Sequence, residues 1–321
     1  MLKRIAVMTS GGDSPGMNGA IRAVVRTGIF YGLEVYGIKY GYQGLLDKNI
    51  AEMDLKSVGG IMQLGGTILM TSRSDEFETK AGVKKGANIL REFNIDALVV
   101  IGGDGSLAGA RDLYEQEDFP VIGIPATIDN DLYGTDTCIG VDTALNTIIS
   151  AIDKIKDTAS SHRRAFMLEV MGRNSGYLAL MSGIAGGAEA VIVPEFPVDI
   201  DKMGEQLNKG YQRGKAHCLF VMAEGAGDVY AVSKAISEKV GFQIRVTILG
   251  HLQRGGSPSV FDRILSSRLG SEAVIQLLEN KYHHMVGLIG NDTKVTPLEN
   301  ILTKKKELRK SLYKLANILA Q

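Results

Sequence analysis

Residues 98–109 read LVVIGGDGSLAG, and this stretch decides the kind of fold that the chain can form. It starts within an apolar run, Ala97–Ile101, that is rich in β-branched residues and typical of a strand buried on both faces of a sheet. The run stops at the turn Gly102–Ser106, and the pattern of residues 107–114 predicts a helix. A strand, a glycine turn and a helix in this order direct backbone N–H groups and the positive end of the helix dipole at an anion. Asp104 inside the turn adds a carboxylate, which beside bound phosphates favours a divalent cation between them.

The composition is typical of a globular protein and argues against several function classes. Lysine plus arginine equals aspartate plus glutamate at 36 each, so no overall field favours nucleic acid or an anionic membrane. The two cysteines, Cys138 and Cys218, lack the spacing of a zinc site or a disulfide framework, and no apolar run is long enough to span a membrane. The first predicted strand begins at Ile5 with no signal peptide before it, so we expect a cytoplasmic protein.

Apolar runs alternate with helical patterns along the chain. The runs predict strands over residues 5–8, 34–40, 97–101, 120–125, 164–170, 190–193, 218–222, 244–249 and 285–289. The helical patterns cover residues 19–30, 82–93, 107–114, 142–158, 177–185, 203–213 and 261–279, and the lysine-rich Lys304–Lys310 is expected to open a terminal helix with a solvated face. This alternation predicts an α/β fold with two Rossmann-like domains, each a mainly parallel sheet flanked by helices, and an active site in the cleft between them. We place the larger domain at residues 1–140 plus 252–305 and the smaller domain at residues 141–251 plus 306–321.

A second glycine turn, Gly11-Gly12, follows the first predicted strand. Together the two turns form a cradle of backbone N–H groups suited to a polyphosphate, provided that their strands share one sheet. The first turn lacks the Lys-Ser/Thr ending of a P-loop, and Gly103-x-Gly105-x-x-x-Gly109 departs from the dinucleotide-binding GxGxxG spacing. Either turn alone is explained equally well as a strand terminator, so the prediction depends on the pair and on Asp104.

Two carboxylates follow the strand predicted over residues 120–125, in the sequence Thr127-Ile128-Asp129-Asn130-Asp131. In a phosphoryl transfer, Asp129 or Asp131 could orient or deprotonate an attacking hydroxyl. The same residue types are ordinary turn formers, and by spacing alone a turn is the simpler interpretation.

Five arginines stand at or beside predicted strand ends, next to glycine or polar loops: Arg73, Arg164, Arg173, Arg245 and Arg254. A guanidinium offers a planar fork that suits phosphate, although each arginine alone is more often a surface ion pair. Five of them in comparable places in a net-neutral chain indicate a phosphate-bearing substrate besides a nucleotide. His251, three residues before Arg254, either adds a donor or is simply a polar loop residue.

Eight motifs, in order and at family spacing, resemble those of the bacterial ATP-dependent 6-phosphofructokinases along essentially the whole chain. They are SGGDSPGMNGAIR (10–22), GGT (65–67), IGGDGS (101–106), TIDND (127–131), DTALNT (142–147), MGRNSG (171–176), AEG (223–225) and LGHLQRGGSP (249–258). The resemblance implies a phosphotransferase with an alcohol acceptor. It would phosphorylate D-fructose 6-phosphate at the 1-hydroxyl with ATP, giving fructose 1,6-bisphosphate in the committed step of glycolysis.

For the nucleotide, the resemblance implies that Asp104 holds Mg²⁺ and that Tyr42 and Phe77 lie near the nucleotide. The implied ATP-binding residues are Gly12, Tyr42, Arg73, Ser74, Gly102, Gly103, Asp104, Gly105, Ser106 and Gly109. Pyrophosphate-dependent relatives carry Asp at the position of Gly105 and Lys at that of Ala126, so both residues favour ATP. Ala126 itself replaces the glycine usual in ATP-dependent enzymes, and Ser74-Asp75 replaces a more usual Cys-Pro.

For the acceptor, the resemblance implies that Asp129 is the base for the 1-hydroxyl, supported by Thr127 and Asp131. Arg73 and Arg173 would stabilise the transferring phosphoryl group. The implied contacts to the sugar phosphate are Thr127, Ile128, Asp129, Arg164, Met171, Gly172, Arg173, Glu224, Arg245, His251, Leu252, Gln253 and Arg254. Arg164 and Arg245 would come from a neighbouring subunit, which implies a homotetramer with shared active sites.

The resemblance also implies an effector site between subunits, for ADP or phosphoenolpyruvate. Its residues are Arg22, Arg26, Lys156, Gly187, Glu189, Arg213, Lys215 and His217. Lys156 stands where arginine is usual, Gly60 where aspartate is common and Ala216 where lysine is common. Because lysine keeps the charge of arginine but loses its fork, we predict weak allosteric control, especially by ADP.

Other functions remain open from the sequence. The enzyme could use pyrophosphate, or could phosphorylate a related sugar phosphate. NAD kinases and diacylglycerol kinases carry similar glycine turns, but TIDND and MGRNSG have no place in an NAD kinase. A phosphate-binding regulatory protein without catalysis would not need both Asp104 and Asp129.

Overall fold

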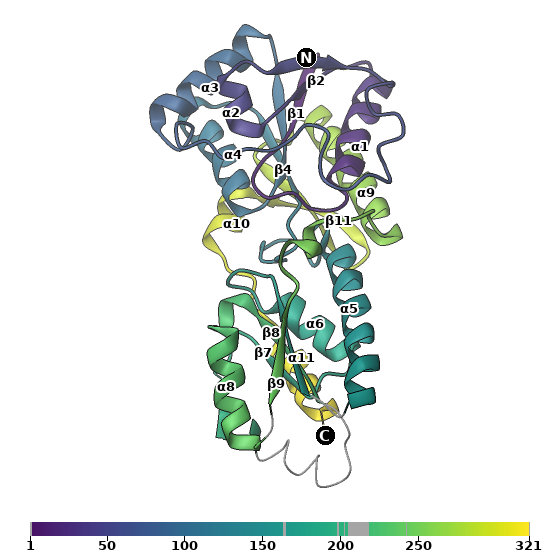
Figure 1. Cartoon of the computed structure of the whole chain (residues 1–321). Coiled ribbons are helices and arrows are strands. Elements are labelled where there is room, and N and C mark those ends of the chain that lie inside the picture. The colour runs from purple at the N-terminus through teal and green to yellow at the C-terminus, as the bar shows by residue number, and fades with distance from the viewer. Residues whose placement is uncertain are drawn as a thin grey trace. The chain divides into compact units, whose positions relative to one another are not determined.

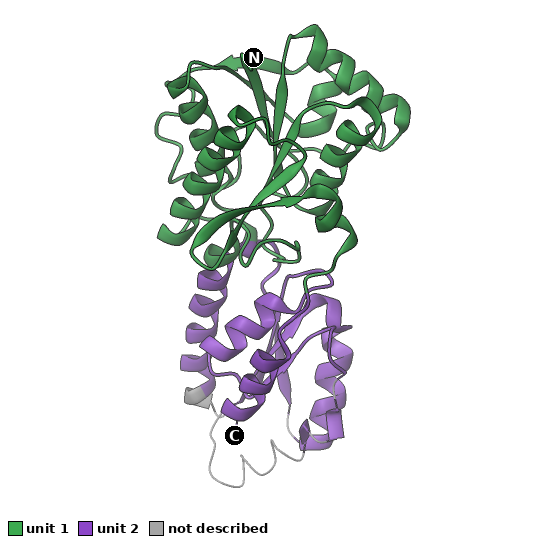
Figure 2. Ribbon diagram, turned by 180° about the vertical axis from the view of Figure 1, so that it is seen from behind, with its two compact units in different colours: residues 1–143, 254–306 green, residues 144–253, 307–321 purple. Residues whose placement is uncertain are grey.

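The computed structural model describes residues 2–162, 165–197, 199–201, 203–204, 218–241 and 243–320. The chain divides into two compact units, which Figure 2 colours separately. Unit 1 consists of Met1–Thr143 and Arg254–Lys306, and unit 2 of Ala144–Gln253 and Glu307–Gln321. The chain therefore passes from one unit to the other at 143/144, 253/254 and 306/307, where the sequence predicted 140/141, 251/252 and 305/306.

Unit 1 contains a seven-stranded sheet in the order β11-β10-β5-β4-β1-β2-β3. Its strands are β1 (Arg4–Thr9), β2 (Glu34–Ile38), β3 (Ile50–Met53), β4 (Ala97–Gly102), β5 (Val121–Pro125), β10 (His284–Ile289) and β11 (Asp292–Pro297). The five inner strands are parallel, and the edge strands β3 and β11 run antiparallel to their neighbours. Every residue of β4 and β5 is buried, as their continuous apolar runs predict. Five of the six residues of β1 are buried as well.

The helices of unit 1 cover both faces of this sheet (Figure 1). On one face lie α1 (Met17–Phe30) and α9 (Val260–Leu278), and on the other α2 (Gly41–Leu46), α3 (Lys80–Glu92), α4 (Asp104–Glu117) and α10 (Leu298–Thr303). The helices α1 and α9 approach closely because glycines stand where they cross. A Cβ placed at Gly270 would lie 2.7 Å from the Ala20 carbonyl oxygen.

Unit 2 contains a sheet whose four described strands are all parallel, in the order β7-β8-β6-β9. These are β6 (Ala165–Val170), β7 (Ala190–Ile192), β8 (Cys218–Ala223) and β9 (Ile244–Ile248). Its helices are α6 (Tyr177–Ala185), α8 (Val229–Val240), α11 (Lys310–Leu319) and α5 (Val141–His162), which begins in unit 1. The core on one face joins Ile236 of α8 to Phe220 of β8, and on the other face Gly183 of α6 lies against Val191 of β7.

The predicted class, α/β with mainly parallel sheets flanked by helices, is confirmed. Among the described residues, no helix combines the length and the hydropathy needed to cross a membrane. The antiparallel strand β11, with the sequence DTKVTP, was missed because it has few buried residues and no apolar alternation. The helix α8 was missed as well. The predicted helix over residues 203–213 lies outside the described residues except for Met203 and Gly204.

Two other expectations were wrong. The strand predicted over residues 34–40 ends at Ile38, and the chain forms the short helix α2 after it, because Tyr40 takes a left-handed conformation with φ +63° and begins a new turn. Lys304–Lys310 was predicted to open the terminal helix, but α10 ends at Thr303 and α11 begins only at Lys310. The residues between them are not helical, and one of their lysines turns inward.

A buried carboxylate fixes the beginning of α5. Asp262 of α9 accepts hydrogen bonds from the backbone nitrogens of Gly140 (2.9 Å) and Thr143 (2.8 Å) and from the Thr143 hydroxyl (2.5 Å). These are donors that the first turn of a helix otherwise leaves unpaired. Burial raises the pKa of Asp262, and the three hydrogen bonds oppose that rise. Asp262 thus connects two segments about 120 residues apart in the sequence, and no local pattern predicted this contact.

Candidate functional site

Three loops gather at the carboxyl edge of the unit 1 sheet. The strands β1, β4 and β5 are neighbours and parallel, and the register pairs Thr9 with Ile101 and Gly102 with Pro125. Backbone hydrogen bonds join the loops that follow, from Ser10 N to Ile101 O (3.1 Å) and from Ala126 N to Gly102 O (2.9 Å). The prediction that both glycine turns end strands of one sheet is confirmed, and the carboxylate loop after β5 lies on the same edge.

Glycine stands at positions 102 and 105 of the turn after β4 for two different reasons. A Cβ placed at Gly102 would lie 2.5 Å from the Ser106 hydroxyl oxygen and 2.6 Å from the Ser10 carbonyl oxygen, so packing requires glycine there. At Gly105, by contrast, no atom of the described residues beyond its chain neighbours and the backbone of its own helix lies within 4 Å of such a Cβ. The helix α4 begins at Asp104, three residues earlier than predicted, so its first N–H groups lie within the turn itself. The open side of the turn at Gly105 is therefore available to a ligand.

Tyr42 supports this turn from inside the protein. Its ring is 6% exposed, is stacked on Phe77 with ring centroids 4.0 Å apart, and lies against Gly109 of α4. Its hydroxyl donates a hydrogen bond of 2.6 Å to the Ser106 carbonyl oxygen. Burial raises the pKa of the Tyr42 phenol well above its usual value, so the hydroxyl stays a donor. The structure thus assigns Tyr42 and Phe77 a supporting position behind the turn.

The variant Tyr42→Phe is expected to lower the free energy of unfolding by about 0.5–1.5 kcal/mol, because it removes a buried hydrogen bond to the Ser106 carbonyl oxygen. Urea denaturation of the variant and of Tyr31→Phe, whose ring is exposed at the end of α1, measures this. Equal midpoints for the two variants would contradict the supporting role.

The loop after β5 carries the predicted base. Asp129 is 3% exposed, and its backbone nitrogen donates a hydrogen bond of 3.2 Å to the Thr127 hydroxyl. A Cβ placed at Gly103 would lie 3.4 Å from the Thr127 Cβ, so this loop lies against the glycine turn. The Ile128 side chain is fully buried, so any contact that it makes with a substrate comes from its backbone.

Two arginines accompany the turns of unit 1. Arg73 is exposed on a loop that the Thr71 hydroxyl ties to the Gly11 carbonyl oxygen at 2.5 Å. The Ser74 hydroxyl of the same loop donates to Gln43 Oε1 at 2.8 Å. Arg254 lies over the turn after β1, where its Nη1 donates to the Asp13 carbonyl oxygen (3.2 Å). A Cβ placed at Gly12 would lie 2.3 Å from that same nitrogen, so glycine at position 12 makes room for the guanidinium.

A second set of predicted residues gathers at the carboxyl edge of the unit 2 sheet. Residues 171–176 follow β6, Glu224 follows β8, and His251 follows β9, all in parallel register. Glu224 Oε1 accepts hydrogen bonds from the backbone nitrogens of Arg173 (2.8 Å) and Gly172 (3.3 Å). Glu224 therefore shapes the loop that carries Arg173.

Gln253 has a similar supporting place. It is 0% exposed, accepts a hydrogen bond from Met171 N (3.1 Å) and donates one to the Gly250 carbonyl oxygen (3.0 Å).

Arg173, His251 and Leu252 are exposed, whereas Met171 and Gly172 are buried. Burial raises the pKa of Glu169 on β6, with the Glu224 carboxylate adding to the rise. The sequence analysis did not single out Glu169, which as one strand residue among many carried no signal.

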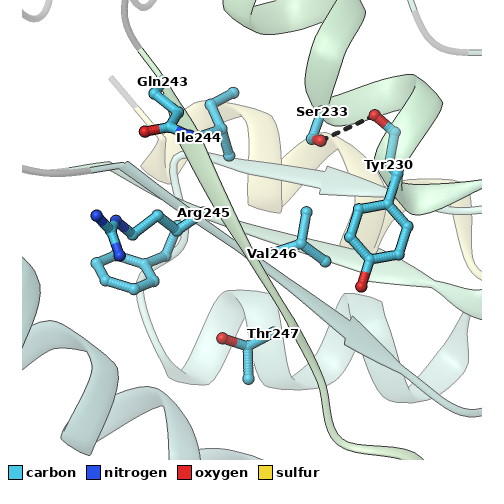
Figure 3. Close-up of a pocket in the computed structure, with 8 residues that line it drawn as sticks. Tyr230, Ser233, Gln243, Ile244, Arg245, Val246 and Thr247 are labelled. Carbon is cyan, nitrogen blue, oxygen red and sulfur yellow. Dashed lines mark hydrogen bonds between the residues drawn. The ribbon is translucent and has the colours of Figure 1, made fainter.

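Arg245 does not lie at this edge. The register pairs it with Phe166, near the beginning of β6, so it stands beside the amino end of β9, at the opposite edge of the sheet. Five residues of strand, about 16 Å, separate the level of Phe166 from that of Met171. Figure 3 shows Arg245 and Thr247 in a pocket of about 550 Å³ with Tyr230 and Ser233 of α8. Arg164 lies outside the described residues.

The predicted effector residues are distributed over both units. Arg22 and Arg26 lie on α1 of unit 1. In unit 2, Lys156 Nζ donates to the Gly187 carbonyl oxygen (3.3 Å), and Glu189 accepts a hydrogen bond from Leu219 N. The remaining predicted members, Arg213, Lys215 and His217, and the departure Ala216 lie outside the described residues.

A comparison with known families matches this arrangement. The sequence profile of the family described as phosphofructokinase matches residues 4–277. The chain belongs to the phosphofructokinase family. The resemblance seen in the motifs is thereby confirmed.

Individual phosphofructokinases extend this match to the full length. The chain is 52% identical to the ATP-dependent 6-phosphofructokinase of Thermotoga neapolitana over 319 residues, which are 99% of this chain and 100% of that one. It is 54% identical to the enzyme of the same name from Halalkalibacterium halodurans, with the same coverage. Among solved structures, phosphofructokinase from Saccharomyces cerevisiae superposes with a TM-score of 0.87 at 38% identity, covering 99% of this chain and 46% of that one.

Proposed function

We propose that this phosphofructokinase transfers the γ-phosphoryl group of ATP to the 1-hydroxyl of D-fructose 6-phosphate, giving fructose 1,6-bisphosphate. The observation that carries the proposal is the open turn at Gly105, which lies on the same sheet edge as the Asp129 loop. It occurs in a chain that is 52–54% identical, over their whole length, to relatives named ATP-dependent 6-phosphofructokinase.

The nucleotide is assigned to the turn Gly102–Ser106 and to Arg73. The N-terminus of α4 directs N–H groups at the phosphates, and glycine at position 105 leaves room for them. Asp104 fits a magnesium ion, because its carboxylate is exposed at the head of α4 and oxygen ligands are those that Mg²⁺ prefers. Bound with ATP, Mg²⁺ neutralises charge on the phosphates during transfer.

The acceptor hydroxyl is assigned to Asp129. In an in-line transfer, the protein mainly positions the two substrates and stabilises charge, and the base receives the hydroxyl proton. Thr127 orients this part of the loop through its hydrogen bond with Asp129 N. Arg73 of unit 1 and Arg173 of unit 2 are exposed guanidinium groups that can stabilise the transferring phosphoryl group.

The sugar phosphate is assigned to Arg173, His251 and Arg254, with Glu224 and Gln253 holding the loop that carries Arg173. Arg245 points to a second copy of the chain. It lies on β9, the edge strand of the described unit 2 sheet, and away from the level of Arg173. A guanidinium at an open sheet edge can reach the 6-phosphate bound by a neighbouring subunit, so the active form is a homo-oligomer, which we propose to be a tetramer.

Control by ADP or phosphoenolpyruvate is expected to be weak. Lys156 provides a single ammonium where an arginine would offer a fork, and Gly60 carries no carboxylate. Initial rates against fructose 6-phosphate, with and without ADP, test this. A strongly sigmoidal curve that low ADP relieves would contradict the expectation.

One assay separates the candidate functions. The purified protein is offered fructose 6-phosphate with either ATP or pyrophosphate, and fructose 1,6-bisphosphate is measured. We expect product with ATP and at least about 100-fold less with pyrophosphate, because the open turn leaves room for the whole nucleotide. Product from pyrophosphate alone would support the second candidate, a pyrophosphate-dependent enzyme, and no product from either donor would refute both.

A further inference from the structure

A lysine far from the sequence motifs contacts the loop of the predicted base. Lys306 belongs to the segment Lys304–Lys310, which the sequence analysis took as a solvated face. Its ammonium instead donates hydrogen bonds of 2.9 Å each to the Asn130 Oδ1 and to the Asp136 carbonyl oxygen. Asn130 directly follows Asp129 in the chain, so Lys306 acts on the residue next to the base.

Asn130 is the centre of this contact. It is buried, and its backbone takes a left-handed conformation with φ +52°, which few residue types other than glycine adopt readily. Its side-chain amide donates to the Asp136 carbonyl oxygen (3.1 Å), and its Oδ1 accepts from Cys138 N (3.0 Å). Because Asn130 and Lys306 share Asp136 as an acceptor, the three residues form a closed ring of hydrogen bonds.

The rest of the loop is attached to the sheet. Ile139 N donates to the Pro125 carbonyl oxygen at 3.0 Å, which closes the two ends of the loop. Asp136 N donates to the Leu288 carbonyl oxygen at 2.7 Å, and Leu288 N donates to the Thr135 hydroxyl at 3.0 Å. Residues 135–136 of the loop are therefore held on β10. The hydrogen-bond ring with Lys306 connects these residues to Asn130, next to Asp129.

The buried thiol of Cys138 lies near Lys306 and near the carboxylates of the loop. Burial raises the pKa of the Cys138 thiol to about 12. The Lys306 ammonium opposes that rise, and the carboxylates of Asp131 and Asp129 add to it. All three charges are therefore near one buried thiol.

We propose that Lys306 is a positioning residue for Asp129, holding it through Asn130 at the place where it meets the acceptor hydroxyl. This inference rests on the proposed function. Lys306 is the last residue of unit 1 before the chain enters unit 2, and under this inference it affects the reaction through Asn130. Transfer of a phosphoryl group depends steeply on position, since a shift of about 1 Å in a reacting group can cost two orders of magnitude in rate.

The neighbouring lysines provide a matched control. Lys305 has an exposed side chain, and the Lys304 ammonium lies over the Tyr133 ring at 5.3 Å. The test compares Lys306→Met, Lys306→Arg and Lys305→Met by steady-state kinetics with ATP and fructose 6-phosphate. Arginine can restore the two hydrogen bonds, because its guanidinium has several donors in a fork. The thermal midpoint of each variant shows whether it is folded at the assay temperature.

The expected result is a fall in kcat of about ten-fold for Lys306→Met, with KM for ATP within about two-fold of the unchanged protein. Lys306→Arg and Lys305→Met should keep kcat within about three-fold. A merely structural role would instead lower the midpoint and move kcat and KM for ATP together, without recovery in Lys306→Arg, and this outcome overturns the inference. Equal kcat for Lys306→Met and Lys305→Met overturns it too. Failure of the unchanged protein to phosphorylate fructose 6-phosphate would refute the proposed function instead.

Discussion

Replacing Asp129 by asparagine is expected to lower kcat for fructose 6-phosphate about 10²–10⁴-fold, the range that a positioned general base contributes. The substitution keeps the volume of a side chain that is only 3% exposed, and it removes the oxygen that can take the proton of the 1-hydroxyl. KM for ATP should stay within about three-fold, because an interaction made with the acceptor in the transition state does not hold the nucleotide. The main loss is thus expected in the chemical step.

The control for Asp129→Asn is Asp112→Asn, the same chemical change on α4 at the carboxylate that pairs with Arg111. We expect the control to keep kcat close to that of the unchanged protein, because a partly exposed ion pair between neighbouring residues contributes little. Steady-state rates over a range of both substrates, together with thermal unfolding of each variant, check the prediction. If Asp129→Asn kept kcat within ten-fold, Asp129 would be excluded as the base, and the same substitution at Asp131 would be the next to measure.

Replacing Gly105 by aspartate is expected to raise KM for ATP about 100-fold, because a carboxylate inside the phosphate-binding turn repels the phosphates at a cost of about 2.8 kcal/mol. The fold should tolerate the change, since no atom of the described residues beyond its chain neighbours and the backbone of its own helix lies within 4 Å of a Cβ at this position. The backbone at Gly105 also does not take a left-handed φ, so a residue with a side chain can adopt its conformation. The thermal midpoint is therefore expected to change little while the affinity for the nucleotide falls.

The variant Gly105→Asn separates charge from size in this experiment, since asparagine fills nearly the same volume without the negative charge. We expect its KM for ATP to rise less than that of Gly105→Asp, by about ten-fold. A direct measurement of nucleotide affinity is a calorimetric titration of each variant with ATP in the presence of magnesium. Equal losses in the two variants would show that space alone, and not charge, determines the response at this turn.

Much of the site was predicted from the sequence because its signals are local. A buried strand, a glycine turn and a helix start are written in consecutive residues, and the turn after β4 has this form in the structure. The adjacency of β4 and β5 follows from their short parallel connection through α4, whereas two other strands stand between β1 and β4 in the chain. The register confirms that the loops after all three strands share one edge. Residues in motifs were therefore assigned to the correct loops.

The sequence did not predict which of those residues support a loop and which are exposed to a ligand. Glu224 and Gln253 stand in motifs that resemble a sugar site, yet their side chains hold the backbone of residues 171–173. The arginines were grouped by their places at or beside strand ends, but the register puts Arg245 near the beginning of its strand, away from the carboxyl edge. A motif specifies a residue type and a loop, whereas the direction of a side chain depends on partners from other strands.

By itself, the sequence determined the α/β class, the glycine turns, the carboxylate loop and the family, because each of these depends on residues close together in the chain or on motifs in order. Only the tertiary structure decided which side chains support the loops and which face outward. The contact of Lys306 with Asn130 spans 176 residues, and that of Asp262 with Gly140 spans 122. Such contacts leave no periodic pattern in the sequence, because they form only when packing of the sheets and helices brings distant segments within hydrogen-bond distance.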